Sequence, residues 1–312
     1  MSGTFNHLLV AQEALNAFMD TDVDPELRIC VAKNQKYIFL GANAPDFPYV
    51  AKHDKWGDRM HYELSSKIVN KARSLLMKLR NKDEAAFAKC FCWFLGYLSH
   101  MVVDATIHPV VKIIAGPYSE SEQNKKKHRL CETHMDCYIY HEKANELPLN
   151  EAEYINDKIK TGCCPEKPAK IDCDIRKFWM EILMQVFNDS ADLDPDQWFF
   201  FYSTLTDAIT EESNNKISKC LAKVFDQSEL MQINQNNIDY FYINHLKTPN
   251  GSKIDFLNLF DFAAKNTVEI WKIFASALNR NTALPDILNK DWNLDSGVAS
   301  GENIFWRNNH VA

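Results

Sequence analysis

The chain has 312 residues, a formal net charge of −7 at pH 7 and a sequence pI near 5.8. It is long enough to bury a large hydrophobic core, and its acidic balance excludes the broad basic surface of many nucleic-acid-binding proteins. Hydrophobic residues make up 46% of the chain, charged residues 25%, and glycine occurs only 9 times. This composition predicts a soluble globular protein built of long helices with short connections.

Hydrophobic residues recur at helical spacing along the whole chain, and no segment of useful length alternates as a strand does. Residues 161–172, which contain glycine, proline and cysteine, separate two helical halves. Asp194 before Pro195 predicts a capped helix start. The expected helices span residues 6–19, 58–82, 85–101, 128–147, 175–187, 195–212, 215–225 and 255–280. The sequence therefore predicts an all-α protein.

Targeting and redox features point to the cytoplasm. The first 20 residues lack the basic flank and unbroken apolar stretch of a signal peptide, and no segment is expected to be apolar enough to span a membrane. Nine cysteines, an odd number, are predicted to be mostly reduced thiols. Cys163, Cys164 and Cys173 lack C-x-x-C spacing and a nearby histidine, so a structural role is favoured over a metal or disulfide site.

The segment 96–109, "GYLSHMVVDATIHP", places polar groups on one side of an apolar helix. At about 100° per residue, His100, Asp104 and His108 fall within an arc of about 80°. A buried carboxylate without a partner is unfavourable by several kcal/mol, and a metal ion is the simplest partner for Asp104. Pro109 disfavours the helical conformation at His108, so the helix is expected to end or kink there.

Further metal-ligand types occur in the first half of the chain, where eight of the ten histidines lie. Asp46 lies in the Gly/Pro-rich segment "GANAPDFPY", and His61 lies in "MHYEL". His128 and Glu132 are one helical turn apart, a spacing that lets two side chains bind one ion. Each residue alone is more often a turn, surface or hydrogen-bonded residue; the order of the whole set indicates a metal site.

Five segments together resemble the zinc-dependent phospholipase C family, which shares its fold with the P1/S1-type nucleases. They are "TFNHLLVAQEAL" (4–15), "GANAPDF" (41–47), "DRMHYE" (58–63), "FLGYLSHMVVDATIHP" (94–109) and "HRLCETHMD" (128–136). The resemblance implies a single all-α domain over residues 1–312, with the metal motifs in 1–140 and residues 173–312 completing the helices.

The resemblance also implies two to three Zn²⁺ ions and a set of ligands for each. One ion would be held by Asp46, His61, His100 and Asp104. Asp104 would bridge to a second ion bound by His7, and a third would be held by His108, His128 and Glu132. Three ions with three ligand carboxylates leave net positive charge to attract a phosphate. Asp136, one turn beyond Glu132, is expected to accept a hydrogen bond from a metal-bound imidazole.

The sequence departs from the family pattern in two places. Secreted members begin with a tryptophan that completes one zinc site, whereas Met1 stands here, so backbone groups of residues 2–4 or water are the candidate ligands beside His7. The gap between Asp104 and His108 is also shorter than in the best-known secreted members, which suggests a divergent branch.

Such a site would hydrolyse phosphate esters with zinc-activated water that Asp46, the expected catalytic residue, orients or deprotonates. A phospholipid is the expected substrate, with peripheral membrane contact. The aromatic run "WFFFY" (198–202) could serve that contact but is predicted to be mainly core. A P1/S1-like single-strand nuclease, a phosphatase and a non-catalytic metal-stabilised binding protein are the alternatives, and nucleic acid is expected as a partner only for the nuclease.

Overall fold

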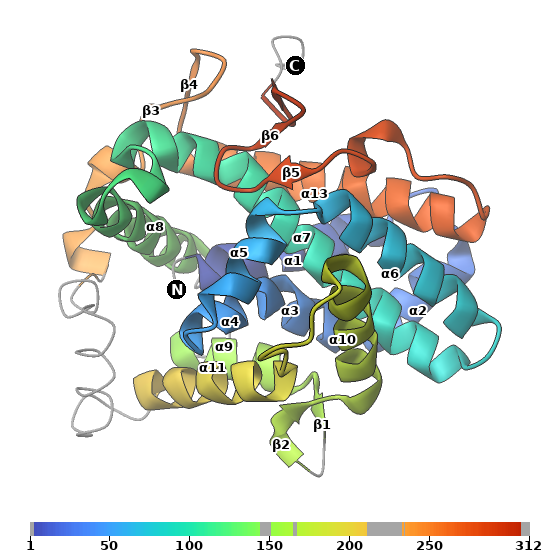
Figure 1. Cartoon of the computed structure of the whole chain (residues 1–312). Helices are drawn as coiled ribbons and strands as arrows, with labels where there is room; N and C mark the ends of the chain where they lie inside the picture. Colours follow the sequence, from blue (N-terminus) through green and yellow to red (C-terminus); the bar gives the residue numbers. More distant parts are fainter. Residues whose placement is uncertain (1–2, 144–150, 165–166, 211–232, 234, 307–312) are drawn as a thin grey trace.

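The computed structural model describes residues 3–143, 151–164, 167–210, 233 and 235–306. Helices dominate these residues, which confirms the all-α prediction (Figure 1). The α-helices are α1 (Thr4–Met19), α2 (Pro25–Asn34), α3 (Lys36–Asn43), α4 (Phe47–Val50), α5 (Asp54–Tyr62), α6 (Ser65–Arg80), α7 (Glu84–Ala115), α8 (Glu122–Lys143), α9 (Glu151–Lys160), α10 (Cys173–Phe187), α11 (Pro195–Thr210) and α13 (Phe256–Asn279). The predicted helix 215–225 lies outside the described residues.

Short 3-10 helices and small antiparallel sheets connect the helices. The 3-10 helices include η1 (Ala44–Asp46), η2 (Tyr118–Glu120) and η6 (Tyr240–Tyr242). β1 (Cys163–Cys164) pairs with β2 (Lys167–Ile171), β3 (Leu246–Lys247) with β4 (Lys253–Ile254), and β6 (Val298–Ala299) pairs with both β5 (Trp292–Asn293) and β7 (Glu302–Asn303). These strands are too short to give the alternation by which a sequence reveals a strand.

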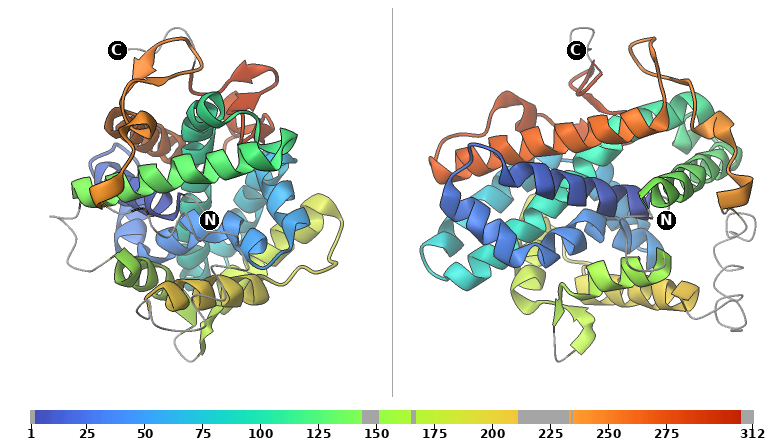
Figure 2. Two further views of the ribbon diagram at one scale, coloured as in Figure 1. Left: turned by 90° about the vertical axis from the view of Figure 1, so that its left-hand side faces the viewer. Right: turned by 180° about the vertical axis from the view of Figure 1, so that it is seen from behind.

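Helix α7 is the central element of the fold (Figure 1). It packs against α1, α3, α8 and α13, and every residue from Cys90 to Ile107 is buried. Figure 2 shows α13 lying along α1 on the side opposite the view of Figure 1. Contrary to expectation, α7 is long and apolar enough by composition to cross a membrane, but 89% of its most apolar window is buried within the protein. It is therefore the core helix of this fold.

Two glycines let α3 and α7 cross closely. A Cβ added at Gly41 or at Gly96 would overlap a backbone carbonyl of the other helix. Only glycine allows this approach, because any side chain would force the two backbones apart. The crossing places the Ala42 carbonyl oxygen 2.9 Å from His100 Nδ1. The packing of α3 on α7 therefore also orients a predicted ligand.

Gly96→Ala is expected to lower the free energy of unfolding by about 1–3 kcal/mol, because the added methyl overpacks the α3–α7 crossing. This loss should outweigh the roughly 1 kcal/mol that alanine contributes to a helix interior. Thermal unfolding followed by circular dichroism measures it. Gly57→Ala is the comparison variant, since the nearest atoms to its added Cβ belong to the Tyr49 side chain, which can move, and not to the backbone of a second helix. An equal or smaller loss in Gly96→Ala than in the comparison variant would contradict the proposed role of the crossing.

The central helix does not end at His108, because α7 continues to Ala115 with Pro109 inside it; the alternative of a kink at this position stays a prediction. Proline has no N–H, so the Ala105 carbonyl loses its helical donor. The backbone of Gly297, in the loop before β6, packs against this position, where a Cβ would overlap both the Ala105 carbonyl oxygen and the Pro109 ring. Packing by the C-terminal segment thus accommodates the proline.

The expected single helix over 58–82 is in fact two helices, α5 and α6. They are separated at Leu64, which has φ +50. The C-terminal segment stabilises this break, since Asp291 accepts hydrogen bonds from the Ser66 N–H and hydroxyl, and Ser65 Oγ accepts one from the Trp292 N–H. The helical periodicity of 58–82 cannot show a break that distant residues stabilise.

The second half of the chain extends the same hydrophobic core, which runs from Phe5 to Trp306. Asp194 caps α11 as predicted, accepting from the Asp196 and Gln197 N–H groups. The aromatic run 198–202 is only partly core. Trp198, Phe199 and Tyr202 are buried, whereas Phe200 is 50% and Phe201 44% exposed.

The cysteines form no disulfide among the side chains that the structure describes. Cys30, Cys90, Cys92, Cys131 and Cys173 are free thiols, and Cys163 is buried in β1. The carboxylates on either side of Cys173 both pair with Lys89, at 3.0 Å and 2.8 Å, so lysine neutralises this acidic group. The side chain of Cys164 lies outside the described residues.

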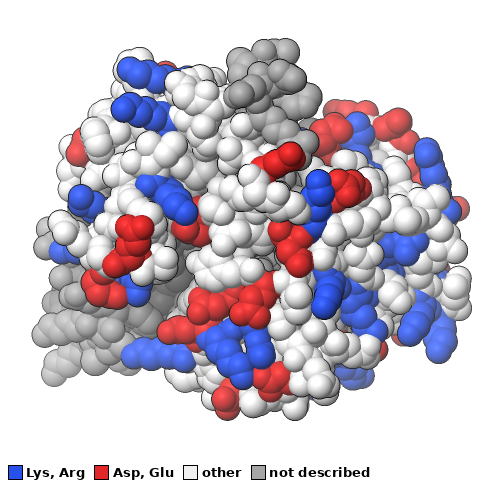
Figure 3. Space-filling view, turned by 45° about the horizontal axis from the view of Figure 1, so that its top comes forward, with Lys and Arg blue, Asp and Glu red and all other residues white. Residues whose placement is uncertain are grey.

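Charged side chains of both signs are interspersed over the face drawn in Figure 3. No large field of a single charge forms on this face, in agreement with the expectation from composition.

Candidate metal centre

The eight predicted ligands come together from five elements of the first half of the chain. His7 comes from α1, Asp46 from η1 and His61 from α5. α7 supplies three ligands and α8 two: His100, Asp104, His108, His128 and Glu132. Each of the eight has at least one other within 4 Å, and these contacts link them into one cluster.

Asp104 is the centre of this cluster, and its two carboxylate oxygens face different imidazoles. Oδ2 lies 3.1 Å from His100 Nε2 and 3.5 Å from His61 Nε2. Oδ1 lies 3.3 Å from His7 Nε2 and 3.3 Å from His108 Nε2. A carboxylate divided between two sets of imidazoles has the geometry needed to bridge two cations.

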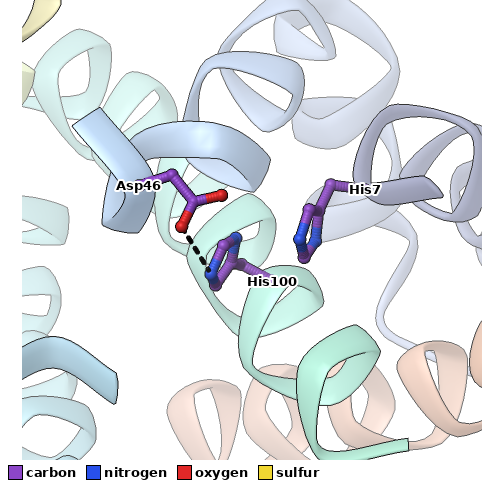
Figure 4. A group of neighbouring side chains, drawn as sticks. All are labelled: His7, Asp46 and His100. Carbon is purple, nitrogen blue, oxygen red and sulfur yellow. Dashed lines mark ion pairs between the residues drawn. The ribbon is translucent and has the colours of Figure 1, made fainter. Parts of the chain in front are cut away.

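Asp46 and His7 lie on either side of His100 (Figure 4). Asp46 Oδ1 is 3.4 Å from His61 Nε2 and 3.9 Å from His100 Nε2. The His7 ring stacks on the His100 ring with centroids 4.1 Å apart. Asp46 therefore joins the set around Asp104 Oδ2, and its position on a 3-10 turn lets its carboxylate reach α7 from the side.

His108, His128 and Glu132 form a second group at the other end of the cluster. Glu132 Oε1 lies 2.9 Å from His108 Nε2 and 3.2 Å from His128 Nε2. Because α7 does not end at His108, this imidazole stays on the Asp104 face and connects the two groups.

Backbone carbonyls fix the tautomers of two ligands. His61 Nδ1 is 2.8 Å from the Gly57 carbonyl oxygen, and His100 Nδ1 is 2.9 Å from that of Ala42. A carbonyl oxygen only accepts, so each Nδ1 carries a proton and each Nε2 presents a lone pair in the neutral ring. The two Nε2 atoms lie 3.1 Å apart. Two facing lone pairs repel each other unless a proton or a metal cation lies between them, and this donor set of imidazoles and carboxylates fits zinc.

Several buried polar atoms of the cluster have no hydrogen-bond partner in the structure. They are His7 Nδ1, His128 Nδ1, Asp104 Oδ2 and Glu132 Oε2. Such atoms are unfavourable in a protein interior unless a ligand or water satisfies them. Two of the four are carboxylate oxygens of predicted ligands, which is the expected pattern around a cation site.

The acidic members of the cluster stay ionised despite burial. Burial would raise the pKa of Asp104, but His108 and His100 hold it well below its usual range. Burial would likewise raise the pKa of Asp46, which His100 and His61 lower. Burial lowers the pKa of His108, but Asp104 and Glu132 raise it to about 10. A cation that binds His108 must therefore displace a proton.

Asp136 joins the start of α1 to α8. It accepts hydrogen bonds from the N–H groups of Phe5 and Asn6 and from the Asn6 side chain. His61 and His100 direct their Nδ1 atoms to backbone carbonyls, and the imidazole partner expected for Asp136 stays a prediction. Asp136 anchors the first turn of α1 to α8, and this contact positions His7 one residue further on.

The backbone near His7 is only partly described. Residue 2 lies outside the described residues, and the Gly3 carbonyl accepts the His7 N–H at 2.9 Å. Thr4 Oγ1 lies 3.4 Å from the Tyr202 hydroxyl. The predicted backbone ligands of residues 2–4 therefore stay a prediction.

The cluster opens into a cleft of about 440 Å³ that all eight residues except His100 line. A volume of this size is typical of small-molecule sites. The other lining residues are Tyr49, Val50, Asp54, Asp58, Tyr62, Tyr118, Glu122, Lys125, Arg129 and Asp295. Apart from the basic run 124–129, which contains Lys125 and Arg129 and was expected to be a solvated loop, the sequence does not single out these residues. Arg129 lay inside the quoted motif directly after His128, whereas Asp295 is brought to the cleft by the distant C-terminal segment.

Comparison with known proteins agrees with this geometry. A family model described as zinc dependent phospholipase C matches residues 6–189, more than half of the chain, and this span contains all eight predicted ligands. No curated protein and no solved structure matched the chain. The chain belongs to the zinc-dependent phospholipase C family.

Proposed function

We propose that this protein is a phosphoric ester hydrolase of phospholipase C type that works with two to three zinc ions in the cleft. The family membership supports a zinc phospholipase-like hydrolase. The main supporting observation is that each Asp104 carboxylate oxygen contacts a different pair of imidazoles. Oδ2 contacts His61 and His100, and Oδ1 contacts His7 and His108. When bound, zinc supplies the Lewis acidity that ionises water near neutral pH and offsets charge on a phosphoryl group.

The residues of the chain have separate roles in this proposal. His61 and His100, which the Gly57 and Ala42 carbonyls orient, would bind the metal together with Asp104. Asp46 is ionised, its side chain is 19% exposed, and it lines the cleft. It therefore orients the attacking water and accepts its proton. No side chain is required as a nucleophile, so hydrolysis proceeds without a covalent intermediate.

Metal content and paired substrates test the proposal. Protein purified without chelator or affinity tag should contain two to three zinc equivalents by mass spectrometry. Chelation should lower its melting temperature, because a ligand that binds only the folded state stabilises it. A soluble phosphocholine ester should then be hydrolysed faster than a single-stranded oligonucleotide.

Other outcomes would support the alternative functions. Preferential cleavage of the oligonucleotide would favour a nuclease. Full zinc occupancy without turnover of either substrate would favour a metal-stabilised binding protein. Protein without transition metal, whose melting temperature does not respond to added Zn²⁺, would refute the metal centre itself.

A further inference from the structure

Helix α8 presents a basic stripe beside its metal-binding stripe. His128 and Glu132 lie one turn apart on α8, and so do Lys125 and Arg129. At about 100° per residue all four fall within an arc of about 100°. All four line the same cleft. A phosphate at the metal centre would therefore lie beside a surface that already carries two positive charges.

Arg129 has no anionic partner among the described residues. Its one hydrogen bond is from Nε to the Lys125 carbonyl oxygen at 3.4 Å, and no described carboxylate lies within 4.0 Å of its guanidinium. The two Nη groups are therefore free to donate a pair of parallel hydrogen bonds to an anion. A planar guanidinium fork matches the geometry of a phosphate or carboxylate.

Lys125 is held near the metal ligands but is only weakly neutralised. It pairs with Glu122, whose side chain is 82% exposed, at 2.7 Å. Such an exposed pair contributes little and is readily exchanged for a ligand anion. Lys125 also lies over the Tyr118 ring, 5.8 Å from its centroid, and that ring meets the His128 ring edge to face at 5.1 Å. Tyr118 thus connects Lys125 to the metal centre.

The rest of the cleft rim has the opposite charge. Asp54 and Asp58 come from α5, and Asp295 comes from the C-terminal segment. Asp295 pairs with Lys112 at 3.5 Å, outside the set that lines the cleft. Glu122 of α8 also lines the cleft, but it pairs with Lys125. An anionic group of a ligand is therefore repelled by the α5 side of the rim and attracted to Lys125 and Arg129. The cleft, at about 440 Å³, has room for more than a single phosphate.

We propose that Arg129 and Lys125 form an anion subsite that binds a second anionic group of the substrate, separate from the phosphate that is cleaved. The inference rests on the proposed function for the place of the first phosphate. The ligand chemistry is an organic phosphate that carries another phosphate or carboxylate a few atoms away. Arg129 and Lys125 then determine specificity and take no part in the chemical step.

Binding to the zinc-loaded full-length protein, measured by isothermal titration calorimetry, tests this subsite. The probes are propyl phosphate, propane-1,3-diyl bisphosphate and 4-(phosphonooxy)butanoate, which share one phosphate and differ in the distal group. At least one of the two doubly anionic probes should bind about tenfold or more tightly than propyl phosphate, as expected for a hydrogen-bonded charge pair. A preference for only one of them identifies the second group as phosphate or carboxylate.

Substitution on α8 assigns the preference to a residue. Arg129→Gln should lose most of the preference while its affinity for propyl phosphate stays nearly unchanged. Lys127→Gln, on the same helix but outside the cleft, should keep the wild-type preference. Circular dichroism and zinc content confirm that each variant is folded and loaded.

Three results would overturn the subsite. They are equal binding of all probes by wild type, equal weakening of all probes by Arg129→Gln, and a preference that survives in Arg129→Gln. The second would place the guanidinium on the phosphate at the metal centre. A protein that binds with the expected preference but hydrolyses no ester would refute the proposed function and leave the subsite intact.

Discussion

Asp104→Asn is expected to lose at least one zinc equivalent and nearly all hydrolysis. The amide keeps the shape of the side chain, but it removes the negative charge that lets one group serve two cations. In this structure the two Asp104 oxygens contact four imidazoles between them, at 3.1–3.5 Å, so no other described residue replaces it. Zinc content by mass spectrometry and turnover of a phosphocholine ester measure both effects.

The matched control is Asp286→Asn, which removes a carboxylate that is 81% exposed and lies outside the cleft. It should keep the zinc content and turnover of the unmutated protein. Because Asp104 is buried, the folded state of the Asp104→Asn variant needs a separate check by circular dichroism. A folded Asp104→Asn protein with full zinc and normal turnover would show that Asp104 does not bridge.

The all-α fold and the spacing of the ligands within α7 and within α8 could be predicted because they depend on local sequence, whereas the joining of His7, Asp46 and His61 to the same site followed only from the family resemblance. The run His100, Asp104, His108 stays on one stripe as long as the helix continues, and its apolar surroundings place that stripe inside the protein. His128 and Glu132 are fixed relative to each other in the same way. The order of motifs along the chain then identified the family, which the family match confirms.

Features that depend on distant residues could not be predicted. Whether α7 ends at Pro109 depends on Gly297, which packs beside the proline. The break at Leu64 depends on Asp291 and Trp292. Proline statistics and helical periodicity describe only the local chain, so a helix end at His108 and an unbroken helix over 58–82 were both wrong expectations. In each case the C-terminal segment determines the outcome.

The role of Asp136 shows the same limit at the candidate site. Its spacing from Glu132 placed it on the metal-binding side of α8, which the structure bears out, since it lies beside the start of α1. Its partner could not be read from spacing, because a carboxylate accepts equally well from an imidazole or from the free N–H groups of a helix N-terminus. The docking of α1 on α8 decides between them.

Asp46→Asn separates a catalyst from a metal-stabilised scaffold. Asp46 lies on η1, outside the apolar packing that carries Asp104, so the variant should keep its fold. It should bind zinc more weakly, because one ligand loses its charge. At matched zinc occupancy, hydrolysis of a phosphocholine ester should fall by on the order of 10²–10⁴, the usual scale for removal of a general base.

The pH dependence of the unmutated protein completes this test. The neighbouring imidazoles keep the pKa of Asp46 below its usual range, so this carboxylate is already ionised well below neutrality. The ionisation of Asp46 should therefore not control the rate near neutral pH. The rate should instead rise toward pH ~7, where water bound to zinc ionises. Steady-state rates between acidic and neutral pH, with zinc content verified at each point, measure this profile. If Asp46→Asn and the unmutated protein hydrolyse the ester equally slowly and without pH dependence, the cleft binds its ligand without catalysing its hydrolysis.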